Sequence, residues 1–198
     1  MPNFNKEFSQ KSYSLFSDFC FALYEHFGEQ TDVSIPVPYE PAPPDDCGLG
    51  CVAMLLKFKN VSIPTIQQLS RQYKNKEYYI DNVGWKHDGL VAILEQFGIA
   101  AYRVGHQGIF QISHSLKKEK PLIASLRVPR VDNLAKDGVY VSEDKSQPLI
   151  GHLCVIVGIE NGNILFHDPR NIQIYKDKLR VPFTDFRKVF TGRCIYLK

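Results

Sequence analysis

The stretch Asp45-Asp46-Cys47-Gly48-Leu49-Gly50-Cys51-Val52-Ala53-Met54-Leu55-Leu56 places a cysteine at the start of an apolar run with helical spacing. A thiol there would meet the unpaired N–H groups of the first helical turn and the positive end of the helix dipole, and both favour the nucleophilic thiolate. The neighbouring glycines would let another backbone, or a substrate, approach closely. The stretch therefore predicts that Cys47 is a nucleophile, if a histidine and a carboxylate join it from elsewhere.

A histidine and a carboxylate do occur together later in the chain. The run Gly151-His152-Leu153-Cys154-Val155-Ile156-Val157-Gly158 predicts a buried strand that opens on a histidine. The run Ile164-Leu165-Phe166-His167-Asp168-Pro169 predicts the returning strand, which the proline ends. Because the turn signal Glu160-Asn161-Gly162-Asn163 lies between them, the two runs predict an antiparallel hairpin.

The length of the hairpin loop decides whether His152 and Asp168 can meet, because directly opposed residues share one face of a sheet. A five-residue loop from Gly158 to Gly162 puts His152 opposite Asp168. A two-residue turn at Asn161-Gly162 puts the two side chains on opposite faces. We therefore expect the wider loop, since the chemistry needs the imidazole and the carboxylate on one face.

The composition is that of an ordinary one-domain globular protein. The chain has 198 residues, 44% hydrophobic and 23% charged, with a formal net charge of +3. This charge is too small to predict a nucleic-acid partner, and no apolar stretch reaches the ~20 residues of a membrane span. The first residues lack the layout of a signal peptide, and five cysteines form no even disulfide framework. We therefore expect free thiols in the cytoplasm, with secretion by another signal left open.

Periodicity predicts helices first and an antiparallel sheet afterwards, which is an α+β order. Helical spacing predicts helices over residues 12–28, 46–58, 65–73, 88–97 and 184–190, with Asp46 and Asp88 as caps and Gly98 as a terminator. Strand-like runs occupy residues 99–104, 121–128, 179–181 and 193–197, besides the hairpin. A mixed segment at 109–116 and a long polar connection at 129–150 separate these runs. Five prolines between residues 34 and 44 predict a stiff connector that leads to the cysteine helix.

Several motifs in order resemble the C39-like cysteine peptidases, which are papain-fold proteins. They are Asp46-Cys47-Gly48 with Cys51 and Met54, Gly-His before an apolar strand, Asp168-Pro169, Gly84-Trp85-Lys86-His87-Asp88-Gly89-Leu90, Val181-Pro182-Phe183-Thr184-Asp185-Phe186 and Thr191-Gly192-Arg193. The resemblance covers residues 39–198 and implies a papain-like α+β catalytic domain there, with the nucleophile helix packed on a C-terminal antiparallel sheet. Residues 1–38 would form an N-terminal helical extension and the proline-rich connector.

The resemblance implies a catalytic triad that acts on a peptide or protein substrate with no cofactor and no metal. Cys47 would be the nucleophile, His152 the base and Asp168 the partner that orients the base.

The sequence departs from the family pattern before the cysteine. The family usually has a glutamine six residues earlier, which donates to the oxyanion, and here Pro41 holds that position. Glu40 cannot donate when it is ionised. The second oxyanion donor is therefore unassigned, with Tyr39 or a backbone group as candidates.

We expect peptide hydrolysis, and other interpretations stay open. The same fold and triad would serve acyl or amide transfer, as in a transglutaminase-like enzyme or a biosynthetic acyltransferase. Pro41 makes a non-catalytic peptide-binding module a further alternative. Cys47 could be only a small buried hydrophobe, and Asp168 could merely start an Asx turn before its proline. A zinc site would use Cys47, Cys51, His152 and Asp168. It is disfavoured, because cysteines four residues apart on one helix are a poor tetrahedral pair.

Overall fold

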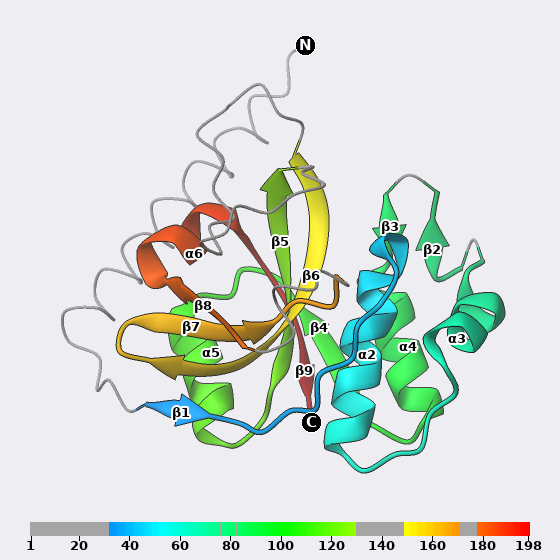
Figure 1. Cartoon of the computed structure of the whole chain (residues 1–198), viewed down its shortest axis with the longest axis horizontal. Coiled ribbons are helices and arrows are strands. Elements are labelled where there is room, and N and C mark those ends of the chain that lie inside the picture. Colours follow the sequence, from blue (N-terminus) through cyan, green and yellow to red (C-terminus); the bar gives the residue numbers. More distant parts are fainter. Residues whose placement is uncertain (1–31, 76, 82, 130–148, 171–177) are drawn as a thin grey trace.

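The structure is a computed structural model, and it describes residues 32–75, 77–81, 83–129, 149–170 and 178–198 (Figure 1). Five α-helices pack on an antiparallel sheet within these residues, which confirms the predicted α+β class. The helix predicted over residues 12–28 lies outside the described residues, as does most of the connection predicted over 129–150. The domain boundary after residue 38 stays a prediction.

The helices form close to where periodicity predicts them. They are α2 (Cys47–Phe58), α3 (Ile66–Tyr73), α4 (His87–Gln96), α5 (Ile109–Lys117) and α6 (Phe183–Val189), and a short 3₁₀ turn η1 (Pro44–Asp46) precedes α2. Thr65 caps α3 through a capping box with Gln68. Asp88 is not the cap of α4, because Lys86 holds that position and the Asp88 carboxylate pairs with Arg103 instead. The mixed segment at 109–116 is helical and forms most of α5.

The sheet is antiparallel throughout. Its strands lie in the order β4 (Ala101–Val104), β9 (Phe190–Leu197), β5 (Leu122–Pro129), β6 (Leu149–Glu160), β7 (Asn163–His167) and β8 (Leu179–Pro182). The short β1 (Val33–Ser34) also pairs with β6, next to Gly158 and Ile159. A separate two-stranded ribbon, β2 (Tyr79–Ile80) and β3 (Gly84–Trp85), is not predicted by the sequence pattern, because each strand has only two residues.

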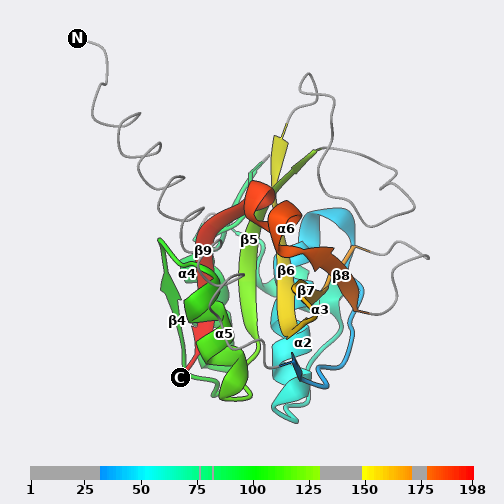
Figure 2. The same ribbon diagram turned by 90° about the vertical axis from the view of Figure 1, so that its left-hand side faces the viewer.

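The helices form a layer on each side of the sheet (Figures 1 and 2). In Figure 1, α2, α3 and α4 lie on one side, and α5 and α6 lie on the other. Helix α2, which begins at Cys47, runs along β6, and its side chains from Leu49 to Leu56 are fully buried. Burial of this apolar face against the sheet therefore fixes where Cys47, at the start of α2, meets the strands.

The hairpin of β6 and β7 differs from the predicted one. Its turn is the two-residue Asn161-Gly162, with φ values of 48° and 74°, which is typical of a type I′ turn. The expected five-residue loop is therefore wrong. A β-bulge compensates: Gly158 pairs with Leu165 but Ile156 pairs with Phe166, so one residue of β6 has no partner on β7.

The bulge residue is Val157, and it decides which face His152 occupies. One extra residue in a strand moves every side chain beyond it to the other face. Beyond the bulge Val155 pairs with His167, so that Cys154 lies opposite Asp168 and His152 lies two residues further on the same face. His152 and Asp168 thus share a face in spite of the tight turn.

The start of the proline-rich connector supports the bulge. The N–H of Ile35 donates to the carbonyl of Val157 at 2.8 Å, so the connector is bonded to the bulge residue itself. β1 then lies against Gly158 so closely that a Cβ there would stand 2.3 Å from the carbonyl oxygen of Val33. Gly158 is therefore required for close approach of two backbones.

We expect Gly158→Ala to lower the free energy of unfolding by about 1–3 kcal/mol, because the new methyl group would push β1 away from β6. Urea denaturation followed by circular dichroism measures this change. Gly151→Ala is the matched control on the same strand, since a Cβ at Gly151 would meet no atom within 4 Å. Its effect should stay within about 0.5 kcal/mol. Equal effects of the two substitutions would contradict the packing described here.

Candidate active site

Cys47 is the first residue of α2 and is half-buried. Asp46 precedes it at the N-cap position, but its side chain makes no capping hydrogen bond. The carboxylate turns to α3 instead, where it accepts from the Ser70 hydroxyl at 3.3 Å and pairs with Lys74 at 3.8 Å. The positive end of the α2 dipole is therefore not covered by the Asp46 side chain, and it acts on the thiol.

The two glycines after Cys47 make room for other parts of the protein. A Cβ at Gly48 would stand 2.8 Å from the Cβ of Trp85, whose indole N–H donates to the carbonyl of Asp45 at 3.1 Å. A Cβ at Gly50 would stand 2.6 Å from the Cβ of Pro169. Close approach at these positions thus brings the segment around Pro169 against the start of α2.

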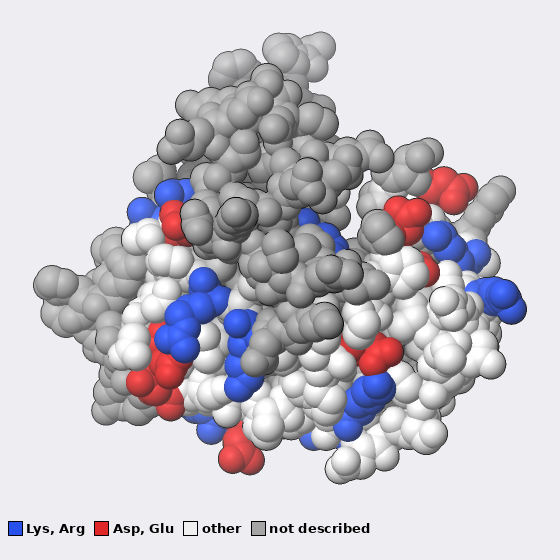
Figure 3. Space-filling model, viewed as in Figure 1, with Lys and Arg blue, Asp and Glu red and all other residues white. Residues whose placement is uncertain are grey.

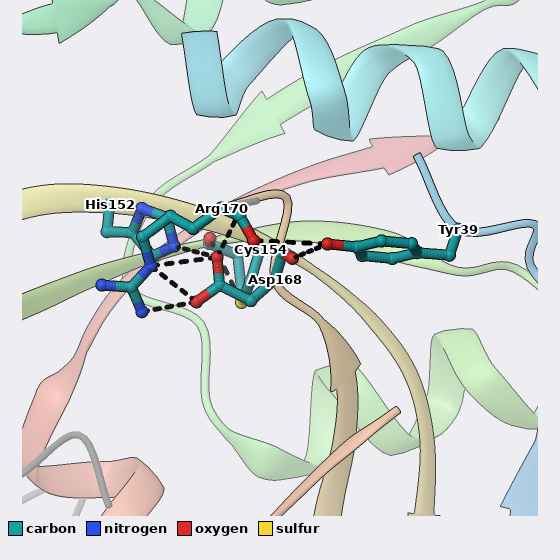
Figure 4. Close-up of polar contacts among 6 residues, drawn as sticks. Tyr39, His152, Cys154, Asp168 and Arg170 are labelled. Carbon is teal, nitrogen blue, oxygen red and sulfur yellow. Dashed lines mark hydrogen bonds and ion pairs between the residues drawn. The ribbon is translucent and has the colours of Figure 1, made fainter. Parts of the chain in front are cut away.

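His152 and Asp168 form a buried pair at the end of the sheet nearest Cys47. Nε2 of His152 lies 2.8 Å from Oδ1 of Asp168, and both side chains are less than 5% exposed (Figure 4). A side-chain hydrogen bond with Cys47 is among the causes that raise the pKa of the same imidazole, which places the thiol beside it. Because Nε2 faces the carboxylate, Nδ1 is the ring nitrogen left for the thiol. The structure thus brings together the three side chains that the sequence singled out.

The charges in this cluster stabilise one another. Burial by itself would lower the pKa of His152, but the Asp168 charge and the hydrogen bonds with Asp168 and Cys47 outweigh it and raise the pKa to about 9. Burial would likewise raise the pKa of Asp168. The charges of His152 and Arg170 and their hydrogen bonds instead hold this pKa well below its usual range. At neutral pH the pair is therefore an imidazolium and a carboxylate.

Arg170 is a member of the site that the sequence analysis missed. Its Nε lies 3.1 Å from Oδ1 and 2.9 Å from Oδ2 of Asp168, and its Nη2 also donates to Oδ2 (Figure 4). Its backbone N–H donates to Oδ1 at 2.9 Å, so Asp168 starts an Asx turn as well as holding His152. The available signal was the order Asp-Pro-Arg, since an Asx turn brings the third residue back to the aspartate.

The connector also holds the turn around Pro169 in place. The Tyr39 hydroxyl donates to the carbonyl of Asp168 at 3.0 Å and to that of Arg170 at 3.3 Å, and the N–H of Ala42 donates to the carbonyl of Pro169 at 2.6 Å. Burial, followed by the charges of Asp168 and Glu40, raises the pKa of Tyr39 to about 12, so it stays a donor. Three consecutive carbonyls are thus fixed from the connector.

These contacts bear on which residue could be the second oxyanion donor. The Tyr39 hydroxyl is directed at main-chain carbonyls, so it supports the turn instead of the oxyanion. Glu40 pairs with Lys57, which lies about 15 Å along α2 from Cys47. Pro41 has no donor in its side chain or its backbone. The second donor is thus not assigned among these residues.

The other thiols near the site are buried, and the neighbouring histidine contacts a main-chain carbonyl. Burial raises the pKa of Cys51 and Cys154 well above the usual value and that of Cys194 to about 12. His167 contacts the carbonyl of Val37 through Nε2 at 2.9 Å, away from the thiol. In the described part of the chain, no group of three or more His, Cys, Asp and Glu side chains is arranged to hold a metal ion.

The described surface carries charges of both signs. Lys, Arg, Asp and Glu side chains lie interspersed on the described part of the face in Figure 3. Among the described helices, none combines the length and the apolar character needed to cross a membrane.

Known structures share this fold. A candidate C39-like peptidase from Bacillus anthracis has a TM-score of 0.62 and 16% identity, over 85% of this chain and 98% of that one. A double glycine motif protease from an AMS/PCAT transporter, solved with the leader peptide, has a TM-score of 0.55 and 17% identity, over 85% and 99%. The peptidase domain of Streptococcus ComA, a bifunctional ABC transporter of a quorum sensing pathway, has a TM-score of 0.56 and 20% identity, over 81% and 97%.

The sequence comparisons bear on which family the chain belongs to. No curated protein matches the chain at a significant level. The sequence profile of the Peptidase_C39 like family, however, matches residues 30–193, a range that contains Cys47, His152 and Asp168. Because this match covers most of its length, the chain belongs to the Peptidase_C39 like family.

Proposed function

We propose that this protein is a cysteine peptidase that uses Cys47, His152 and Asp168 as a catalytic triad. One observation carries the proposal. The buried imidazole of His152 lies 2.8 Å from the Asp168 carboxylate, and interaction with the Cys47 thiol at the start of α2 helps to raise its pKa. A nucleophile, a base and a group that orients the base are the parts that such chemistry requires.

Each residue has a role in the proposed reaction. The Cys47 thiolate attacks the carbonyl carbon of a peptide bond, and the His152 imidazolium gives its proton to the leaving amine, which leaves a thioester. Neutral His152 then takes a proton from water, whose oxygen attacks the thioester and releases the acid and the thiolate. Asp168 holds the imidazole in one orientation and stabilises its charged form throughout.

The proposed site has only one assigned oxyanion donor. The backbone N–H of Cys47 at the helix start supplies one donor in our proposal. Pro41 supplies none, and loss of one oxyanion donor typically costs ~10²–10³ in rate. We therefore expect slower turnover than a site with two donors would give. A peptide-binding module without turnover is the second candidate, and the same proline favours it.

We propose a peptide substrate, and a reducing compartment such as the cytoplasm as the setting. A neighbour of the same fold is a double glycine motif protease bound to a leader peptide, so peptides with a Gly-Gly motif are the first substrates to test. The described cysteines Cys47, Cys51, Cys154 and Cys194 are all free, which suits a reducing compartment.

We expect the purified protein to cleave members of a peptide library that includes Gly-Gly motifs, and Cys47→Ala to abolish cleavage. Mass spectrometry of the products measures both. Because a half-buried thiol leaves little cavity, the free energy of unfolding should change by no more than about 1 kcal/mol. Cys194→Ala, which removes a thiol from β9, is the control that keeps activity. Full activity of Cys47→Ala would contradict the proposal. If the unmodified protein bound peptides without cleaving them, the result would favour a non-catalytic peptide-binding module.

The pH dependence of cleavage should follow His152. Its pKa is raised to about 9, so the imidazolium that protonates the leaving amine persists through neutral pH and is lost as the pH rises through that value. We expect kcat/KM to fall above about pH 9. Circular dichroism at each pH shows whether the protein is still folded. A fall centred near 6.5, the ordinary pKa of histidine, would contradict this role.

Alkylation should separate Cys47 from the other described thiols. Iodoacetamide reacts with thiolates, and burial keeps Cys51, Cys154 and Cys194 protonated. We expect peptide mapping after brief treatment in mildly acidic buffer to find Cys47 modified and these three unmodified until denaturant is added. His152→Ala should slow the labelling of Cys47. Labelling of Cys51 as fast as that of Cys47 would contradict this assignment.

A further inference from the structure

We propose that Arg170 is a positioning residue of the triad: its guanidinium holds the Asp168 carboxylate in the orientation that presents Oδ1 to Nε2 of His152. The inference rests on the proposed peptidase function and adds a fourth residue to it. Nothing in the chemistry requires Arg170 to touch the substrate. It acts through Asp168.

The guanidinium of Arg170 contacts both oxygens of the Asp168 carboxylate. Nε of Arg170 lies within hydrogen-bond distance of both carboxylate oxygens, at 3.1 and 2.9 Å, while Nη2 donates to Oδ2. A planar guanidinium that contacts both oxygens fixes the rotation of the carboxylate as well as its position. The backbone N–H of the same residue donates to Oδ1 at 2.9 Å. The side of Oδ1 that faces His152 is thereby determined.

The position of Arg170 is itself fixed. Its side chain is only 14% exposed, and its carbonyl accepts from the Tyr39 hydroxyl at 3.3 Å. The preceding carbonyl, of Pro169, accepts from the N–H of Ala42. Because two carbonyls of this turn accept hydrogen bonds from the connector, the backbone of Arg170 is held where its guanidinium reaches Asp168. The contact is therefore part of the fold and does not depend on a bound peptide.

Arg170 has a second effect on the site that opposes the first. Its positive charge lowers the pKa of His152, whereas its grip on Asp168 keeps the carboxylate ionised. Removing the charge while keeping the carboxylate should therefore raise the pKa of His152. Removing the planar guanidinium while keeping a positive charge should misalign the carboxylate. The two effects can be measured separately.

Other charged or titratable groups also face this pair and bear on the pH dependence. Cys47 and Cys51 face it from α2, Cys154 from β6 and Tyr39 from the connector. Burial keeps Cys51 and Cys154 protonated, and the pKa of Tyr39 is about 12, so these three stay neutral around pH 9. Arg170 is therefore the charged group, besides Asp168, that we expect to set the alkaline limit.

The test compares Arg170→Met, Arg170→Lys and the unmodified protein. Methionine removes both the positive charge and the guanidinium. Lysine keeps the charge but has no planar group to contact both carboxylate oxygens. We expect kcat to fall about tenfold in both variants, the order of effect seen when a group that orients a metal-binding ligand is removed. We expect the alkaline limit to lie about half a pH unit higher in Arg170→Met than in Arg170→Lys, because both variants lose the guanidinium but only methionine also removes the charge. Arg180→Met, which removes an exposed arginine paired with Glu160 on β8 and β6, is the matched control and should change neither.

Two results would overturn the proposal. One is an unchanged kcat in both variants, and the other is the same alkaline limit in Arg170→Met and Arg170→Lys. If Arg170→Met does not fold, as judged by thermal denaturation, the kcat of Arg170→Lys decides. NMR titration of the His152 imidazole keeps this test separate from the proposed function. Should the unmodified protein cleave no peptide, the peptidase proposal fails. A lower imidazole pKa in Arg170→Lys than in the unmodified protein then still supports the positioning role of Arg170, because the carboxylate is misaligned while the charge stays, and an unchanged one refutes it.

Discussion

The site depends on one unpaired residue in β6. The bulge at Val157 sets the face on which every residue from Ile156 back to His152 lies. Without it, the tight Asn161-Gly162 turn would put His152 and Asp168 on opposite sides of the sheet. The bulge residue is fully buried, and its carbonyl is paired with Ile35. An unpaired buried carbonyl would cost about 1–3 kcal/mol, so this contact is what makes the irregular strand tolerable.

The connector before α2 therefore does more than lead the chain to Cys47. It fixes the bulge through Ile35 and the turn around Pro169 through Tyr39 and Ala42. Its composition fits this work, since proline removes N–H groups that would otherwise be left without an acceptor along an extended segment. Ile35 and Ala42, which lie among the prolines, each donate to a carbonyl of the β6–β7 hairpin or of the turn that follows it. His152 and Asp168 are thus held from the same segment, one through the strand and the other through the turn.

Much of this arrangement could be predicted from the sequence, and the failures have physical causes. The apolar runs and the Asn-Gly turn predicted the hairpin, and Cys47, His152 and Asp168 were predicted as partners. The loop was wrong because a bulge has no signature in the alternation of apolar and polar residues when a strand is apolar on both faces. Gly158 was the local sign of it, since a glycine within a strand often marks a bulge or a close backbone. Arg170 was missed because an ion pair formed through a turn depends on side-chain direction.

The charges of the proposed site also explain why a polar cluster can be buried there. In the reactive state that we propose, the thiolate, the imidazolium, the carboxylate and the guanidinium alternate in sign, so that each charge has an opposite neighbour. Burial of an unpaired charge is costly, and removing one member of a buried pair typically costs about 3–5 kcal/mol. Arg170 therefore does for Asp168 what Asp168 does for His152. Because the carboxylate is shared between two cations, its orientation sets how much of its charge the imidazole experiences. The turn around Pro169, held by hydrogen bonds from the connector, keeps the carboxylate in that orientation.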